Sequence, residues 1–163
     1  MTATFIPTVL PDDPAPVVTT PAPIVTGGWF PPIDPALFRD EQRVDANAIT
    51  DARVRQALIA AIIRVGRDLE KWRLGQVTAG FATLDQVPAL RIDDQSELAI
   101  LYRRAVFTAA KAEIIERFID VDLTGRGERE ASQLDPSVAE LRRDSVHAVR
   151  EILGVGRMTV DLI

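Results

Sequence analysis

The chain contains no cysteine and only one histidine in its 163 residues. The missing thiols exclude disulfides, thiolate zinc sites, iron–sulfur clusters and cysteine nucleophiles. Long apolar runs are also missing, because stretches such as residues 58–63 are far shorter than the roughly 20 residues that cross a bilayer. The N-terminus lacks the basic segment that opens a signal peptide. We therefore expect a protein made in the cytosol without membrane contact.

Positive charge is scarce and unevenly placed. The chain has 19 basic and 24 acidic side chains, a net charge of −5, and no Lys or Arg before Arg39. Tight binding to DNA needs clustered cations that neutralise phosphates. The excess of acidic over basic side chains therefore argues against a protein that binds DNA tightly. The apolar content of 47% is enough for one core in a chain of this length.

Proline is concentrated near the N-terminus, where 9 of the 11 prolines fall at or before position 35. Residues 1–28 are rich in Pro, Thr, Val and Ala and have no periodic apolar face, so we expect an extended arm. Trp29 and Phe30 are expected to be the first residues held against the folded body. The predicted division is an arm at 1–28, a helical domain at 29–154 and an extended tail at 155–163.

Helix signals begin directly after the proline-rich region. Asp34 and Pro35 form an N-cap and a first-turn proline, which predict a short helix to about Gln42. Thr50 is expected to cap a long helix that Gly80 ends. The apolar residues of this helix recur every three or four positions, as one buried face requires: Val54, Leu58, Ile62, Val65, Leu69 and Trp72.

Two further long helices are expected. The first runs from about Gln95 to Asp120, after Asp93 and Asp94, and is apolar round much of its circumference, which predicts a central position. Small residues on one of its faces would let a neighbouring helix approach to roughly 8 Å; they are Ala105, Ala109 and Ala112. The last helix begins or kinks at Pro136 and ends at Gly154, and its apolar face is Val138, Leu141, Ser145, Val149 and Ile152. The predicted fold class is all-α, a bundle of three long helices and one short N-terminal helix.

The last residues change their period from helical to alternating, which is typical of a strand. We expect this tail to dock on a partner in extended form, and the alternative is that it packs back on its own bundle. The candidate docking residues are Arg157, Met158, Thr159, Val160, Asp161, Leu162 and Ile163.

Residues that could carry chemistry are few. His147 has charged helical neighbours, so we interpret it as a solvated or interfacial residue. Asp120 and Asp122 lack the further ligands of a calcium loop and are better explained by solvation of a helix end. The glycines at 125–127 and 154–156 do not follow a strand and open a helix, as a dinucleotide-binding or P-loop motif requires. They are interpreted as flexible connections. We therefore expect no catalytic residue, no metal, no cofactor and no enzyme activity.

Two pairs of arginines lie within helices of mixed charge. Ion pairs within or between subunits are the favoured interpretation, with contact to nucleic acid as the alternative. Together with the two aromatic residues after the arm, they are the candidate contacts to a neighbouring subunit: Trp29, Phe30, Arg103, Arg104, Arg142 and Arg143.

Several strings, in one order, carry a resemblance to a known family. They are WFPPIDPALFRDEQRVD (29–45), ATLDQVPALRID (82–93), LYRRAVFTAAKAEIIERFIDVDLTGRGER (101–129) and LRRDSVHAVREILGVGRMTVDLI (141–163). This chain resembles the GPL family, the head completion proteins of temperate contractile-tailed phages, from about Trp29 to Ile163. The arm is outside the resemblance, and Pro136 and His147 differ from the helix that is usual in the family.

The resemblance implies a head-to-tail connector adaptor that forms a dodecameric ring on the portal of the filled head. Such a ring would extend the DNA channel, stabilise packaged DNA without binding it tightly, and offer a surface to the next neck or tail-completion protein. The protein would then be assembled in the host cytoplasm and lie in the neck of the virion, with its tail on the portal or on an adjacent subunit. The alternative is a terminase small subunit or a similar oligomeric DNA-recognition factor, which the missing basic face argues against.

Overall fold

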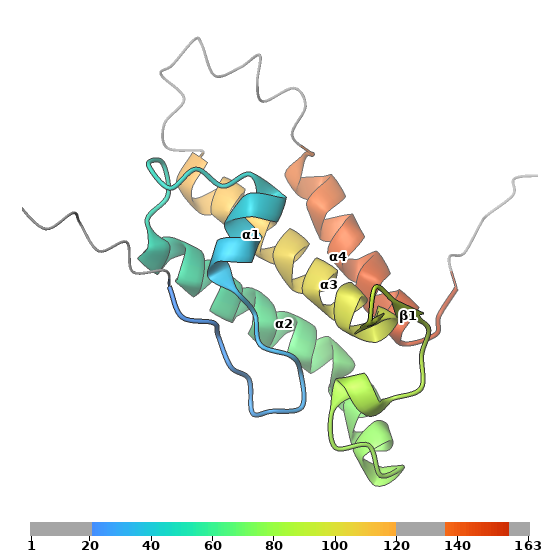
Figure 1. The fold of residues 1–163 in the computed structure, drawn as a ribbon. Coiled ribbons are helices and arrows are strands. Elements are labelled where there is room, and N and C mark those ends of the chain that lie inside the picture. The colour runs from blue at the N-terminus through green and yellow to red at the C-terminus, as the bar shows by residue number, and fades with distance from the viewer. Residues whose placement is uncertain (1–20, 120–135, 157–163) are drawn as a thin grey trace, which may run out of the picture.

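The computed structural model describes residues 21–119 and 136–156, and helices dominate them (Figure 1). The four α-helices are α1 (Pro35–Gln42), α2 (Asp51–Thr78), α3 (Glu97–Ile114) and α4 (Val138–Ile152). A short 3₁₀ helix, η1 (Leu84–Gln86), follows α2, and a π-helical turn, η2 (Ile115–Ile119), continues α3. Two short strands, β1 (Arg91–Ile92) and β2 (Gln95–Ser96), pair antiparallel. The prediction of a mainly helical fold is confirmed.

Helix α3 packs against both α2 and α4 and forms the middle of the molecule (Figure 1). Ala105, Ala109 and Ala112 are all buried, as the small-residue face predicted. The hydroxyl of Ser145 on α4 donates a hydrogen bond of 2.9 Å to the backbone carbonyl of Ala105. This bond shows that α4 approaches the backbone of α3 closely at the alanine face.

The predicted start of this central helix is wrong by two residues, because a hairpin occupies residues 91–96. Asp93 and Asp94 connect the two strands and have positive φ angles of 50° and 58°. A two-residue turn with positive φ at both positions is the common hairpin connection, and Asp tolerates it better than most residues. Helix α3 therefore begins at Glu97, with Ser96 in the capping position.

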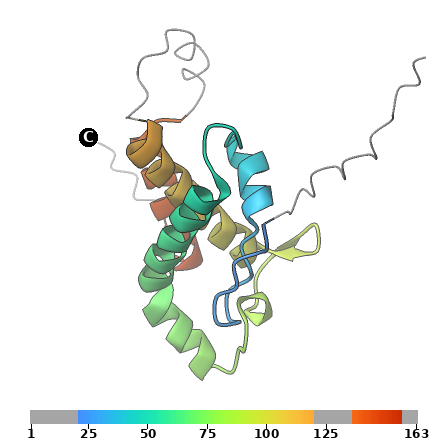
Figure 2. The same ribbon diagram turned by 90° about the vertical axis from the view of Figure 1, so that its left-hand side faces the viewer.

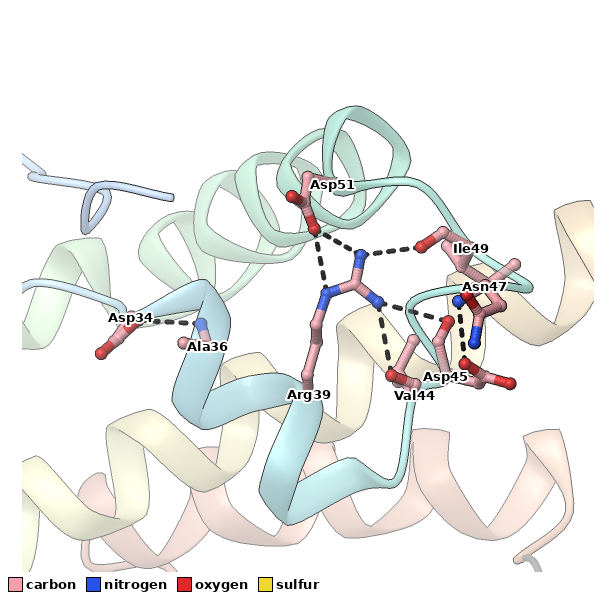
Figure 3. Close-up of polar contacts among 8 residues, drawn as sticks. All are labelled: Asp34, Ala36, Arg39, Val44, Asp45, Asn47, Ile49 and Asp51. Atoms are coloured by element: carbon pink, nitrogen blue, oxygen red, sulfur yellow. Dashed lines mark hydrogen bonds and ion pairs between the residues drawn. The ribbon is translucent and has the colours of Figure 1, made fainter. Parts of the chain in front are cut away.

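Helix α1 has the predicted limits, with Asp34 as its N-cap and Pro35 in its first turn. Arg39 fixes this helix to the start of α2 (Figure 3). Its Nη2 donates to a carboxylate oxygen of Asp51 at 2.6 Å and to the carbonyl of Ile49 at 2.7 Å, and its Nε donates to Asp51 at 3.1 Å. Its Nη1 reaches the carbonyls of Val44 and Asp45 at 3.3 and 3.4 Å. One guanidinium therefore holds the whole connection between two helices.

Helix α2 has the predicted N-cap residue, Thr50, although its hydroxyl makes no capping hydrogen bond. Most of the predicted face is buried, but Ile62 and Trp72 are only partly buried at the edge of the core. The helix passes into a turn at Gly80, whose φ of 99° favours glycine.

The segment before α1 differs from the extended arm predicted for it. Ile24 is buried and forms an isolated antiparallel bridge with Ile33, with N–H···O distances of 2.7 and 2.9 Å. Between them, Gly27 and Gly28 turn the chain with positive φ angles. The folded body therefore includes residues before Trp29, and residues 1–20 of the predicted arm lie outside the described ranges.

Helix α4 begins with a capping box formed by Ser137 and Glu140. The Ser137 hydroxyl accepts from the Glu140 amide at 3.2 Å, and the Glu140 carboxylate accepts from the Ser137 amide at 2.8 Å. Pro136 is exposed and precedes the cap, so it neither starts nor kinks the helix. The predicted apolar face is otherwise confirmed, with Leu141, Val149 and Ile152 buried.

Candidate functional site

The predicted docking tail, residues 157–163, lies outside the described residues. The chain leading to it is held against the end of α4. The Val155 amide donates to the Arg150 carbonyl at 2.9 Å, and the Arg150 side chain donates to the Gly156 carbonyl at 3.2 Å. Gly154 has a φ of 69°, as a helix end of this type requires.

The two aromatic residues predicted to contact a neighbour are used within their own chain. Trp29 is 8% exposed, its indole N–H donates to the Phe81 carbonyl at 3.2 Å, and its ring lies edge-on to Trp72 at 5.8 Å. Phe30 stacks on Tyr102 with ring centroids 4.4 Å apart. These contacts join the N-terminal segment to α2 and α3 and leave Trp29 little surface for a second subunit.

The four candidate arginines form ion pairs within the subunit. Arg104 on α3 pairs with Asp144 on α4 at 3.7 Å, and Arg143 lies 4.0 Å from the same carboxylate. The Arg142 Nε donates to Glu116 at 3.0 Å, and this hydrogen bond raises the pKa of the guanidinium above its usual value.

Arg103 lies at the junction of α1, β2 and α3. It pairs with Glu41 at 3.8 Å and donates to the Gln95 side chain at 3.2 Å. All four arginines therefore have ion-pair partners inside the subunit, and their predicted contact to a neighbouring subunit stays a prediction.

A hollow of about 450 Å³ lies between α3 and α4, and His147 is on its wall. The other lining residues are mostly charged and of both signs: Arg104, Arg143, Asp144, Ala148 and Glu151. Within residues 21–119 and 136–156, no group of three or more His, Asp or Glu side chains could hold a metal ion. The described part of the chain also contains no helix long and apolar enough to span a bilayer.

Two exposed apolar surfaces were not predicted from the sequence. One lies on the outer side of α2, where Ile59 and Ile63 are 41% and 49% exposed. The other is the hairpin, where Leu90 and Ile92 are 62% and 52% exposed. Ile59 and Ile63 lie off the core stripe of α2 at a spacing of four, which is the signal that could have identified the first surface.

A family model described as "Phage head completion protein (GPL)" matches residues 24–163. The chain belongs to the phage head completion protein family. It is 35% identical over 135 residues to the "Head completion/stabilization protein" of Escherichia phage P2, which covers 83% of this chain and 79% of that protein. It is 28% identical over 123 residues to the "Probable head completion/stabilization protein" of Haemophilus phage HP1 (strain HP1c1), covering 76% and 81%. No solved structure matches it.

The match to the head completion family begins at Ile24, the residue that forms the bridge to Ile33. The family match therefore includes the bridge to Ile33. Membership also favours the head completion interpretation over a terminase small subunit.

Proposed function

We propose that this head completion protein acts as an adaptor that forms a dodecameric ring on the portal of a DNA-filled phage head. The observation that carries the proposal is the family match over residues 24–163, which covers every described element from the Ile24 bridge to the end of α4. In this position the ring extends the DNA channel, retains the packaged DNA and presents a surface to the next neck or tail-completion protein.

The charge of the chain supports this role. A ring that DNA passes through must not bind phosphates tightly, and the net charge of −5 fits that need. The arginines at the α3–α4 contact are paired with carboxylates of the same subunit, so they hold the bundle together. The described surface therefore suits a structural part of the virion neck.

In this proposal, the tail at residues 157–163 docks on the portal or on an adjacent subunit. Burying Met158, Val160 and Leu162 contributes about 5–9 kcal/mol, whereas ordering seven residues costs about 7–14 kcal/mol. One tail alone therefore binds poorly, and repetition around a ring must raise the effective concentration of each contact. We accordingly expect the free protein to be monomeric or weakly associated, with the ring forming on the portal.

The test uses portal-bearing heads that lack this protein. Added full-length chain should produce a ring of density below the portal in negative-stain images and should protect the packaged DNA from nuclease. A matched variant truncated after Gly156 should fold with an unchanged melting temperature and fail to protect the DNA. Heads that gain neither density nor protection from the full chain would overturn the adaptor role, and a large fall in melting temperature on truncation would show that the tail belongs to its own bundle.

A further inference from the structure

An exposed row of four side chains runs along the outer side of α2. Ile59, Ile63, Arg67 and Lys71 are spaced four residues apart, so they follow one ridge of the helix. All four are exposed, although the two isoleucines are the kind of residue that a helix usually turns to its core. We call these residues the α2 row.

The cations of the α2 row are not neutralised by the subunit. Among the described residues, neither Arg67 nor Lys71 has an ion-pair partner, and the same holds for the adjacent Arg64. Asp68 adds one negative charge beside them, while Glu70 is already bound to Arg73 at 2.8 Å. The row therefore combines two exposed apolar side chains with an excess of positive charge.

The hairpin combines exposed apolar side chains with negative charge, which is opposite in sign to the charge of the α2 row. Leu90 and Ile92 are more than half exposed, and Asp93 and Asp94 form the turn beyond them. In the described ranges neither of these carboxylates has an ion-pair partner. Arg91 lies back against Asp85 at 3.5 Å, and it also donates to the Asp94 backbone carbonyl. The hairpin tip therefore offers two apolar side chains next to two free negative charges.

Helix α2 and the hairpin lie apart in the subunit. In Figure 2, α2 runs along one side of the molecule and the hairpin projects from the other. A contact between them must consequently join two copies of the chain. Because the two surfaces differ, the contact is head-to-tail, and repeating it generates a ring when the rotation closes.

We infer that the hairpin tip of one subunit, Leu90, Ile92, Asp93 and Asp94, packs on the α2 row of the next. The inference rests on the proposed ring and names the surface through which its subunits meet. The isoleucines and Leu90 supply the apolar part of the contact, and the aspartates face Arg67 and Lys71. The contact is small, so it is weak for one pair and depends on ring closure for its strength. Its charged part is screened by salt, so high ionic strength should weaken it.

Because the chain has no cysteine, introduced cysteines are its only thiols and can be cross-linked specifically. The double variant Ile63→Cys, Ile92→Cys is treated with a short bismaleimide cross-linker, both free at high concentration and bound to portal-bearing heads. A head-to-tail contact should give a ladder of dimers, trimers and larger species. The matched control is Ile63→Cys, Val146→Cys, because Val146 is similarly exposed but lies on α4. This control and both single variants should give no species above dimer.

A second variant tests the charges without altering the cross-linked positions. Arg67→Glu added to the cysteine pair should lower the ladder yield at least fivefold, and Arg43→Glu, an equal charge change at an exposed arginine after α1, should leave it unchanged. The proposed contact would be overturned if the control pair gave the same ladder. It would also be overturned if heads that had bound the Ile63→Cys, Ile92→Cys variant gave no ladder. Neither result would overturn the adaptor role. Failure of the unmodified chain to bind portal-bearing heads would overturn the adaptor role, and the ladder from the free protein would still decide the contact.

Discussion

The Ser145 hydroxyl and the Ala105 carbonyl form a hydrogen bond between two helices inside the core, at 2.9 Å. Ser145 is 7% exposed and Ala105 is fully buried. The bond exists because a methyl group at position 105 lets α4 come close enough for a short side chain to reach the α3 backbone. The closest part of the bundle is therefore fixed by a small residue and a polar one together.

Changing either partner should destabilise the bundle to a different degree. Ser145→Ala removes one hydrogen bond and should lower the free energy of unfolding by about 0.5–1.5 kcal/mol. Ala105→Leu forces extra volume between the helices and should cost about 1–3 kcal/mol. Urea denaturation followed by circular dichroism measures both, with Val146→Ala on the exposed side of α4 as the control. A larger loss for Ser145→Ala than for Ala105→Leu would mean that the close approach is unimportant.

Arg39 should not tolerate replacement by lysine. Its guanidinium donates to one carboxylate and three backbone carbonyls (Figure 3), and a single ammonium group cannot reproduce that fork. Arg39→Lys should lower the free energy of unfolding by about 1–3 kcal/mol, since partly buried carbonyl groups lose their donors. Thermal unfolding measures the effect. The control is Arg104→Lys at the more exposed pair with Asp144, where the change should be close to zero.

Periodicity and cap residues predicted most of the helices. The spacing of Val54, Leu58, Val65 and Leu69 identified the buried face of α2, and Asp34 with Pro35 located α1. The hairpin was missed because two-residue strands contain no period, and Asp93 and Asp94 were expected only to precede a helix that begins at about Gln95. The expectation that Trp29 is held against the folded body is confirmed, but its partners, Trp72 and Phe81, could not be identified because they are distant in sequence. The two exposed apolar surfaces required the fold, since exposure of an isoleucine depends on which neighbours cover it.

The capping box should contribute to the stability of α4. Ser137→Ala removes the hydroxyl that accepts from the Glu140 amide and should cost about 0.5–2 kcal/mol. Hydrogen bonds from the backbone and side chain of Ser137 lower the pKa of Glu140 below 4.5. The carboxylate's contribution is therefore fully present above pH 4.5 and is lost as the pH falls through its lowered pKa. Melting temperatures measured across this range for the unmodified chain and Glu140→Gln should converge in acid, and parallel curves would contradict the assignment.

Tyr102 should make the protein sensitive to alkali. Burial raises the pKa of its hydroxyl from 10 to about 12, and the nearby Thr26 hydroxyl opposes part of the rise. Because the folded pKa is the higher one, the stabilisation is complete below pH 10 and is lost as the pH rises toward 12, a change of about 2–3 kcal/mol.

The chain has only one tyrosine, so the ultraviolet absorbance of tyrosinate reports Tyr102 alone. Its midpoint should lie near the raised pKa, or coincide with unfolding where that comes first. Tyr102→Phe keeps the stack on Phe30 and removes a buried hydroxyl that has no hydrogen-bond partner among the described residues. This variant should be at least as stable at neutral pH and should lose the alkaline sensitivity. A midpoint at the ordinary value in the folded protein would contradict the burial.

The bridge between Ile24 and Ile33 sets how the N-terminal end of the body responds to a pulling force. A load applied at Pro21 acts first on the hydrogen bond from the Arg55 guanidinium to the Ala22 carbonyl, and then on the two backbone hydrogen bonds of the bridge. Residues 22–28 would then extend toward their full contour length of about 25 Å before the load reached Trp29. There the indole bond to Phe81, the backbone bond from the Leu84 amide to the Trp29 carbonyl, and the surrounding aromatic rings must fail together. The N-terminal segment thus extends under load over a short distance, and the resistance to further extension rises at Trp29.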